Sequence, residues 1–129
     1  EQLAAMPGGQ PVLIGGKSMG GRMASMLAVD HRVAGVVCLG YPFHPPGKPE
    51  KLRVDHFARV QSPVLICQGE RDSFGTRAEV EALSLPAQVQ LAWLPDGNHD
   101  LKPRKASGLS HEDNLLACAK AVDEFVAAL

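Results

Sequence analysis

The sequence predicts an α/β fold with three layers, in which a mostly parallel sheet of about four strands has helices on both faces. Short apolar runs alternate along the chain with stretches of helical spacing, as in sheets whose strands are joined by crossover helices. The chain also contains 10 prolines and 13 glycines, which suits many short connections. With 129 residues, we expect a single domain over residues 1–129.

Four apolar runs mark the expected strands. They cover residues 11–15, 33–40, 63–69 and 89–95. The first three runs are apolar on successive residues, which is typical of strands covered on both faces of a parallel sheet. The fourth run alternates more, and this pattern favours a strand at the edge of the sheet.

Helices are expected between and after these strands. Thr76 followed by Glu79 predicts a capping box that opens a short helix through Leu83, and Ser110 with Asp113 is a looser form of the same signal. The helix after the first strand combines a side of small residues, suited to close packing on a sheet, with an apolar stripe of Met19, Met23, Met26 and Leu27. The last helix is indicated by Leu115, Ala119, Val122, Val126 and Leu129.

Charge and hydropathy exclude several kinds of partner. The 13 basic and 14 acidic residues give a net charge of -1, so neither nucleic acid nor an anionic membrane is expected, and the ligand should be a small molecule. No apolar run reaches the roughly 18 residues of a membrane span, and the first residues lack the pattern of a secretory signal. We therefore expect a cytoplasmic protein. Because the chain starts with Glu1 rather than Met, we expect that it has been processed or begins partway through a longer sequence.

The cysteines indicate neither a disulfide framework nor a zinc site. They are three in number, lie far apart and form no C-x-x-C motif. Buried, reduced thiols are the expected state. Asp96 and Asp100 flank His99 without the spacing of metal ligands, so we expect no metal and no other cofactor.

The sharpest local signal is a G-x-S-x-G motif, formed by Gly16, Lys17, Ser18, Met19 and Gly20, between an expected strand and an expected helix. This context is typical of a nucleophile elbow, whose tight turn leaves almost no room for side chains at the flanking glycines. The N–H of Met19, at the helix N-terminus, could then stabilise an oxyanion. In the alternative interpretation, the serine only caps the helix.

A serine nucleophile needs a base, and the base needs an acid that orients it. Asp72 follows the third expected strand, and His99 follows the fourth. Serine, aspartate and histidine in this order, each after its own strand, match the chain order of one group of hydrolases. Glu70 is an alternative acid, but Asp72 lies further into its loop and has the shorter side chain.

Three further residues are candidates for lining a pocket near this site. Lys17 could meet an anionic substrate, although a solvated or salt-bridged lysine is the alternative. Tyr41 and His44 lie in the segment 41–61, which its prolines and glycine make too broken for a long helix. We expect this segment to form a lid-like loop above the carboxyl edge of the sheet. A solvated loop histidine is the alternative for His44, and also for His56.

The motifs together resemble the α/β-hydrolase superfamily. The resemblance covers essentially the whole chain and is carried by residues 15–22, 40–48, 68–72 and 97–99. Within the superfamily, the chain is most similar to a dienelactone-hydrolase-like branch of predicted α/β-hydrolases. The resemblance implies that Ser18 is the nucleophile, Asp72 the acid and His99 the base, with Met19 giving one oxyanion N–H. Dienelactone hydrolases themselves use a cysteine nucleophile, which argues against their substrate here.

The resemblance also implies that this chain lacks the N-terminal half of the fold, because strands that precede the elbow strand in the family are absent. The loop that usually gives a second oxyanion N–H is absent with them. The elbow strand is then left with an unpaired edge, which invites pairing with another chain. We expect this edge to be covered by a second copy in a homodimer, unless the chain is a piece of a longer protein.

These observations lead to two hypotheses of function. The first is a serine hydrolase that cleaves ester-like bonds of a small substrate through an acyl-enzyme. The second is a non-catalytic interaction or scaffold protein, because the eukaryotic relatives of this branch include a non-catalytic subunit of a histone acetyltransferase complex. Loss of one oxyanion donor would lower the rate by about a hundredfold to a thousandfold, which favours the second hypothesis. The presence of Ser18, Asp72 and His99 together favours the first, which is the leading hypothesis.

Overall fold

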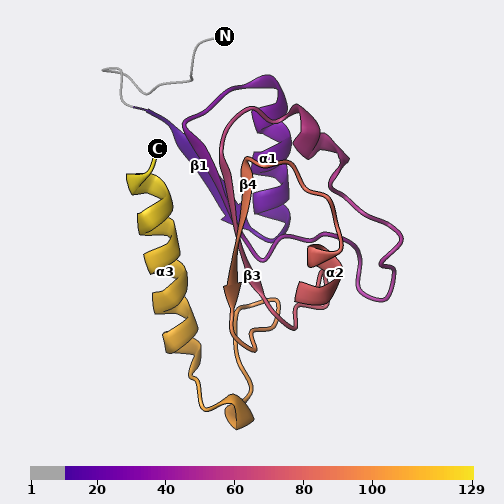
Figure 1. Ribbon diagram of the computed structural model, residues 1–129, viewed down its shortest axis with the longest axis vertical. Helices are drawn as coiled ribbons and strands as arrows, with labels where there is room; N and C mark the ends of the chain where they lie inside the picture. The colour runs from indigo at the N-terminus through magenta and orange to yellow at the C-terminus, as the bar shows by residue number, and fades with distance from the viewer. Residues whose placement is uncertain (1–10) are drawn as a thin grey trace.

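A computed structural model of the protein describes residues 11–129 (Figure 1). Its four strands form one sheet in the order β1-β2-β3-β4, and every neighbouring pair is parallel. The strands are β1 (Leu13–Lys17), β2 (Gly35–Leu39), β3 (Val64–Gly69) and β4 (Val89–Leu94). The predicted α/β class and parallel sheet are confirmed.

The helices cover both faces of the sheet, which gives the predicted three layers. Figure 1 shows α1 (Met19–Asp30) on one side of the sheet and α3 (His111–Ala127) on the other. α1 packs against β1 and β2, whereas α3 packs against β3 and β4. The remaining helical segments are α2 (Arg77–Glu81) and the 3-10 turns η1 (Asp55–Arg59) and η2 (Lys105–Ser107).

Burial differs sharply between the central and the outer strands. Every residue of β3 is buried, as its continuous apolar run predicts. β4 lies at one end of the strand order, so its prediction as an edge strand is confirmed. The prediction that β1 is covered on both faces was wrong, because none of its residues is buried and Leu13, Gly15 and Lys17, which share one face, are exposed.

Both predicted capping boxes are present. The Thr76 side chain accepts the N–H of Glu79 while Glu79 accepts the N–H of Thr76. Ser110 and Asp113 make the same reciprocal pair at the start of α3. Each box satisfies two N–H groups that the first turn of a helix leaves without a carbonyl partner.

The side of small residues on α1 packs on the sheet, as predicted, except at Gly20, which is exposed. Gly21, Ser25 and Ala28 are its buried residues, and a Cβ on Gly21 would lie 2.7 Å from the carbonyl oxygen of Gly16. The opposite stripe faces outward, with 40% to 57% exposure at Met19, Met23, Met26 and Leu27.

The apolar spacing of the last helix identified the helix but not its buried side. Asn114, Cys118 and Phe125 are buried, while Leu115 and Val126 are largely exposed. The buried side is fixed partly by polar bonds, because the side-chain amide of Asn114 donates to the carbonyls of Pro95 and Leu101. The spacing of apolar residues does not reveal polar contacts of this kind.

The segment 41–61 contains only the turn η1, so the prediction that it holds no long helix is confirmed. Its aromatic residues lie in the core, where the Tyr41 ring centroid is 4.9 Å from that of Phe43 and 5.2 Å from that of Phe57. This packing fixes the two ends of the segment against the sheet. Its function as a lid stays a prediction.

Two further expectations bear on the described residues. Cys38, Cys67 and Cys118 are buried and free, as predicted. In the part of the chain that the structure describes, no helix is long and apolar enough to cross a membrane.

Candidate active site

Ser18 stands alone between the last residue of β1 and the first residue of α1. Its backbone has φ 52° and ψ -120°, a combination that residues with a Cβ rarely adopt and that accumulates at active sites. The Ser18 side chain makes no capping hydrogen bond to α1. The interpretation of this serine as a mere helix cap was therefore wrong, and its hydroxyl is available for other partners.

Ser18, His99 and Asp72 form one chain of hydrogen bonds. Ser18 Oγ lies 2.7 Å from His99 Nε2, and His99 Nδ1 lies 2.8 Å from Asp72 Oδ2. A carboxylate only accepts, so Nδ1 carries the proton in this arrangement and the Nε2 lone pair faces the serine hydroxyl. This is the relation in which an imidazole can remove the proton of a serine.

The fold brings the three residues together because parallel strands end at the same edge of the sheet. Ser18 follows β1, Asp72 follows β3 and His99 follows β4. Gly40 follows β2 and lies against the backbone of His99. Its φ is 67°, and a Cβ on Gly40 would lie 2.8 Å from the carbonyl oxygen of His99. A larger residue at this position would displace the loop that carries the histidine.

Asp72 is fully buried and is held on both carboxylate oxygens. Oδ2 faces His99, and Oδ1 accepts the N–H of Phe74 at 2.8 Å. The Phe74 ring also lies against the His99 ring, with 4.2 Å between their centroids. Asp72 and His99 are therefore both contacted by Phe74, which lies in the short loop that carries Asp72.

Glu70, the alternative acid, has a different part in the structure. Its Oε1 accepts the N–H of Asp96 at 2.9 Å, and its Oε2 accepts from Arg77 at 2.9 Å. Both bonds lower the pKa of Glu70 from its usual value, and the bond from the Asp96 backbone N–H has the larger effect. Glu70 thus braces the loop after β4, and the preference for Asp72 agrees with the geometry.

Asp96 is a second brace of the histidine loop, which sequence reasoning missed. Its carboxylate accepts the N–H of Arg104 at 2.8 Å and binds the Arg104 guanidinium at 2.6 Å. Arg104, with a smaller contribution from Arg71, lowers the pKa of Asp96 to about 2. Arg104 lies in a distant part of the loop, so no local motif in the sequence marks the pair.

The glycines of the elbow are not equivalent. A Cβ on Gly16 would lie 2.6 Å from the carbonyl carbon of Gly20 and 2.8 Å from the nitrogen of Gly21, whereas a Cβ on Gly20 would meet nothing within 4 Å. The prediction that the elbow needs a bare residue at Gly20 was wrong. Close approach occurs at Gly16 and Gly21, where β1 and α1 cross.

Met19 is the first residue of α1. The N–H groups of a first helical turn have no carbonyl partner inside the helix and carry the positive end of its dipole. The Met19 N–H follows Ser18 directly in the chain. Its use as an oxyanion donor stays a prediction.

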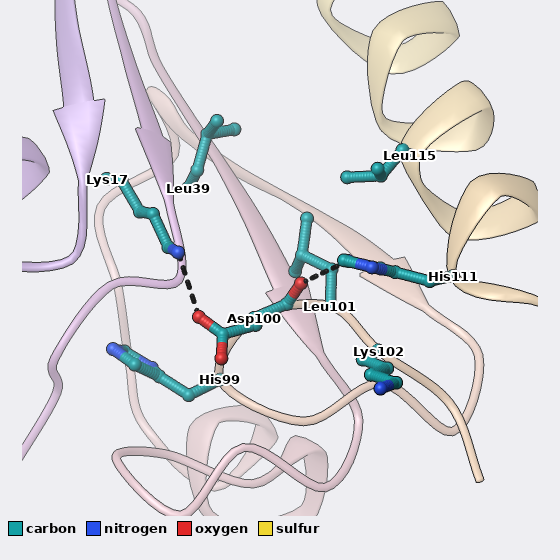
Figure 2. A pocket seen from close by; sticks show the side chains of 8 residues that line it. All are labelled: Lys17, Leu39, His99, Asp100, Leu101, Lys102, His111 and Leu115. Carbon is teal, nitrogen blue, oxygen red and sulfur yellow. Dashed lines mark hydrogen bonds and ion pairs between the residues drawn. The ribbon is translucent and has the colours of Figure 1, made fainter.

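A cleft of about 410 Å³ lies beside His99 (Figure 2). Figure 2 shows Lys17 and His111 approaching Asp100 from opposite sides, the first through an ion pair of 2.8 Å and the second through a bond of 2.9 Å to the Asp100 carbonyl. Lys17 is thus salt-bridged, as its alternative interpretation held. The full lining is Lys17, Leu39, His99, Asp100, Leu101, Lys102, His111 and Leu115.

Most of this lining could not be found from sequence. Leu39 ends β2, Leu101 follows the histidine, and His111 and Leu115 belong to the first turns of α3. These residues share no motif, because they meet only when α3 folds back against the sheet. Lys17 lowers the pKa of Asp100 through their hydrogen bond.

Tyr41 and His44 do not line the cleft beside His99. Tyr41 is fully buried in the core and donates to the carbonyl of Arg53 at 2.6 Å. His44 is only 3% exposed and lines a separate cavity of about 220 Å³. The alternative of a solvated loop histidine was therefore wrong for His44. It was also wrong for His56, which is buried and whose Nε2 lies 2.8 Å from Ser25 Oγ.

No group of three or more His, Cys, Asp or Glu side chains within residues 11–129 is arranged to hold a metal ion.

Comparison with known proteins agrees with this geometry. A family model described as an alpha/beta hydrolase domain matches residues 1–127. A protein of unknown function from Agrobacterium tumefaciens, described as a candidate alpha/beta hydrolase, has a similar structure: the TM-score is 0.67 at 17% identity, over 95% of this chain and 54% of that one.

Two further solved structures share the fold. One is an alpha-beta serine hydrolase homologue from Coxiella burnetii, with a TM-score of 0.52 and 23% identity over 71% of this chain and 42% of that one. The other is the esterase domain of a Rhodothermus marinus protein, with a TM-score of 0.53 and 15% identity over 69% and 52%. This chain therefore spans about half the length of these structures. The family match over nearly all of its residues shows that the chain belongs to the alpha/beta hydrolase domain family.

Proposed function

We propose that this protein is a serine hydrolase that cleaves ester-like bonds of a small substrate through an acyl-enzyme. The observation that carries the proposal is the hydrogen-bonded chain from Ser18 through His99 to Asp72, at 2.7 and 2.8 Å. The strained backbone of Ser18 adds support, because such strain is usual for a nucleophile on an elbow. The similar structures from Coxiella burnetii and Rhodothermus marinus, a serine hydrolase homologue and an esterase domain, also support this function.

In the acylation step, Ser18 Oγ attacks the ester carbonyl while its proton moves to His99 Nε2. The carbonyl oxygen becomes an oxyanion, which the N–H of Met19 stabilises from the start of α1. The imidazolium of His99 is stabilised by Asp72, which is buried and keeps its negative charge. When the tetrahedral intermediate collapses, the bond to the leaving oxygen breaks and that oxygen takes the proton from Nε2.

Deacylation repeats these steps with water. His99 Nε2 removes a proton from the water as its oxygen attacks the acyl carbon, and the second tetrahedral intermediate releases the carboxylic acid. The proton then returns from Nε2 to Ser18 Oγ. The cleft beside His99 has leucines at Leu39, Leu101 and Leu115, which suits a short acyl chain or a small apolar leaving group.

The test is labelling with a fluorophosphonate together with turnover of short-chain nitrophenyl esters. The natural chain should be labelled at Ser18 and should release nitrophenolate with a burst, since the acyl-enzyme accumulates. The Ser18→Ala variant should do neither while retaining the far-UV circular dichroism of the natural chain. His99→Gln is a second variant, which should abolish labelling without removing the serine.

The non-catalytic scaffold is the outcome that would replace this proposal. It predicts a folded chain that is neither labelled nor active, with Ser18→Ala indistinguishable from the natural protein. The triad geometry favours the hydrolase, because a scaffold has no need for a strained serine within 2.7 Å of an imidazole nitrogen.

A further inference from the structure

We infer that His44 is a positioning residue for the triad: as an imidazolium bound to Glu79, it fixes the loop that carries Asp72. The effect on turnover rests on the proposed function, whereas the ion pair itself can be tested without any activity.

Both ring nitrogens of His44 face acceptors. Nδ1 lies 2.7 Å from the carbonyl oxygen of Pro45, and Nε2 lies 3.0 Å from Oε1 of Glu79. A neutral imidazole has one N–H, so it would turn a lone pair toward one of these oxygens. Only the imidazolium donates to both, and the His44 side chain is buried, where an unmatched contact of this kind is unfavourable.

Glu79 is well placed to hold this cation. The same Oε1 also accepts from the backbone N–H of Thr76 at 3.0 Å and from its hydroxyl at 3.2 Å. Three donors on one oxygen indicate an ionised carboxylate, and bonds to Thr76 and His44 lower the pKa of Glu79. His44 is therefore tied to the first turn of α2, which begins just after the acid loop.

The connection from His44 to the triad passes through one residue. The backbone N–H of His44 donates to the carbonyl of Phe74 at 3.1 Å, and the N–H of Phe74 donates to Asp72 Oδ1 at 2.8 Å. The Phe74 ring lies against His99. Phe74 thus contacts both the acid and the base, and His44 holds it from the other side.

The charged groups around His44 favour its protonated form. Burial lowers the pKa of His44, but the bonds to Pro45 and Glu79 and the nearby charges of Glu79 and Asp72 outweigh burial, so the net shift is upward. The other side chains lining the cavity at His44 are apolar: Phe43, Pro49, Leu52, Val80 and Leu83. No cation in this lining opposes the imidazolium.

The direction of the pH effect follows from this raised pKa. The ion pair contributes its full stability below about pH 6.5, the ordinary pKa of histidine, and loses it as the pH rises through the higher value of the folded state. The pH profile of turnover should therefore have an alkaline limb that follows the loss of the ion pair between His44 and Glu79.

Glu79→Gln is the matched variant, because glutamine keeps an acceptor for the capping box while it removes the charge. The ring protons of His44 are followed by NMR over pH 5 to 10 in both proteins, and kcat for a short-chain nitrophenyl ester is measured over the same range. We expect His44 of the natural protein to titrate above about 6.5, and Glu79→Gln to lower this value by about one to three units. The alkaline limb of kcat should move by the same amount.

His44→Asn provides a second variant, since its amide can still donate to the Pro45 carbonyl. It should lower kcat by about tenfold to a hundredfold at pH values where His44 of the natural protein is protonated, as displaced catalytic groups do, with little change in KM. It should also abolish the alkaline limb. A lesion that only destabilised the fold would lower the amount of active enzyme and leave the shape of the pH profile unchanged.

The results separate the two proposals. If Ser18 is not labelled by a fluorophosphonate, the hydrolase proposal fails, and the NMR titration still decides whether the ion pair exists. If Ser18 is labelled but His44 titrates at or below about 6.5, the ordinary value for histidine, the inference is overturned. It is also overturned if the alkaline limb is the same in the natural protein and in Glu79→Gln.

Discussion

The backbone N–H of Ser18 donates to the carbonyl oxygen of Leu39 across 2.7 Å. Leu39 is the last residue of β2, and it lies in register with Lys17, the last residue of β1. The parallel pairing of β1 and β2 therefore continues onto the proposed nucleophile, although its φ is 52°. The sheet thus holds Ser18 in a conformation that it would otherwise avoid.

Comparison of Ser18→Gly with Ser18→Ala should reveal this strain. The conformation is unfavourable by about 1–3 kcal/mol for a residue with a Cβ, whereas glycine adopts it freely. The greater entropy of glycine in the unfolded chain offsets about 0.4–1 kcal/mol of this. We expect the free energy of unfolding, measured in urea, to be about 1 kcal/mol higher for Ser18→Gly than for Ser18→Ala. An alanine variant that is equally stable would mean that the backbone at this position is relaxed.

Asp72→Asn should separate the charge of the acid from its shape. Asparagine can still accept the N–H of Phe74, but it does not stabilise the imidazolium and it favours the wrong tautomer of His99. We expect kcat for ester hydrolysis to fall on the order of 10⁴-fold. Glu70→Gln is the control, since its amide oxygen can still accept the N–H of Asp96, and it should cause a much smaller loss. Equal losses in the two variants would argue against Asp72 as the acid.

The backbone of the site could be predicted from the sequence because each triad residue follows its own apolar run. A run such as residues 63–69 reports a buried strand locally, and parallel strands place Ser18, Asp72 and His99 at one edge whatever their spacing along the chain. The tight turn at Ser18 could also be predicted, because the nearby glycines and the following helix are local features of the sequence. These predictions needed no knowledge of distant contacts.

The environment of the histidines could not be predicted in the same way. His44 and His56 lie in a segment whose prolines resemble those of any surface loop, yet each is buried by a partner from another element: Glu79 for His44 and Ser25 for His56. The buried side of α3 depended likewise on Asn114 reaching the carbonyls of another loop. Such pairings are long-range, so local spacing and composition do not contain them.

Asp96→Asn should change the acid sensitivity of the protein. Arg104 and Arg71 hold the pKa of Asp96 at about 2, below the ordinary value of 3.8. A depressed pKa gives stability that is present above the ordinary value and is lost as the pH falls toward about 2. We expect the natural protein to have a higher melting temperature than Asp96→Asn at pH 5. The difference between the two melting temperatures should be smaller at pH 3. A difference that does not depend on pH would show that the carboxylate charge is not what stabilises the histidine loop.

A homodimer through the β1 edge stays a prediction that light scattering can test. β1 ends the strand order of the described sheet, and its Leu13 is 42% exposed. An unpaired apolar edge favours pairing with another chain, and a charged residue on the edge opposes it. We expect size-exclusion chromatography with light scattering to give a dimer for the natural chain and a monomer for Leu13→Lys. A stable, soluble monomer of the natural chain would contradict the prediction.

Gly16→Ala and Gly20→Ala form a matched pair that tests how the elbow is built. A Cβ on Gly16 would lie within 2.6 to 2.9 Å of the backbone of Gly20 and Gly21, whereas a Cβ on Gly20 would meet nothing within 4 Å. Backbone atoms cannot yield as a flexible side chain does, so Gly16→Ala should destabilise the fold by about 1–3 kcal/mol or more. Gly20→Ala should instead be neutral or stabilising by up to about 1 kcal/mol, because alanine is the better helix former. Urea unfolding of both variants measures the difference, and labelling of Ser18 should survive in Gly20→Ala but fall in Gly16→Ala. If both substitutions were equally harmful, the second glycine of the motif would have a role beyond the contacts between β1 and α1.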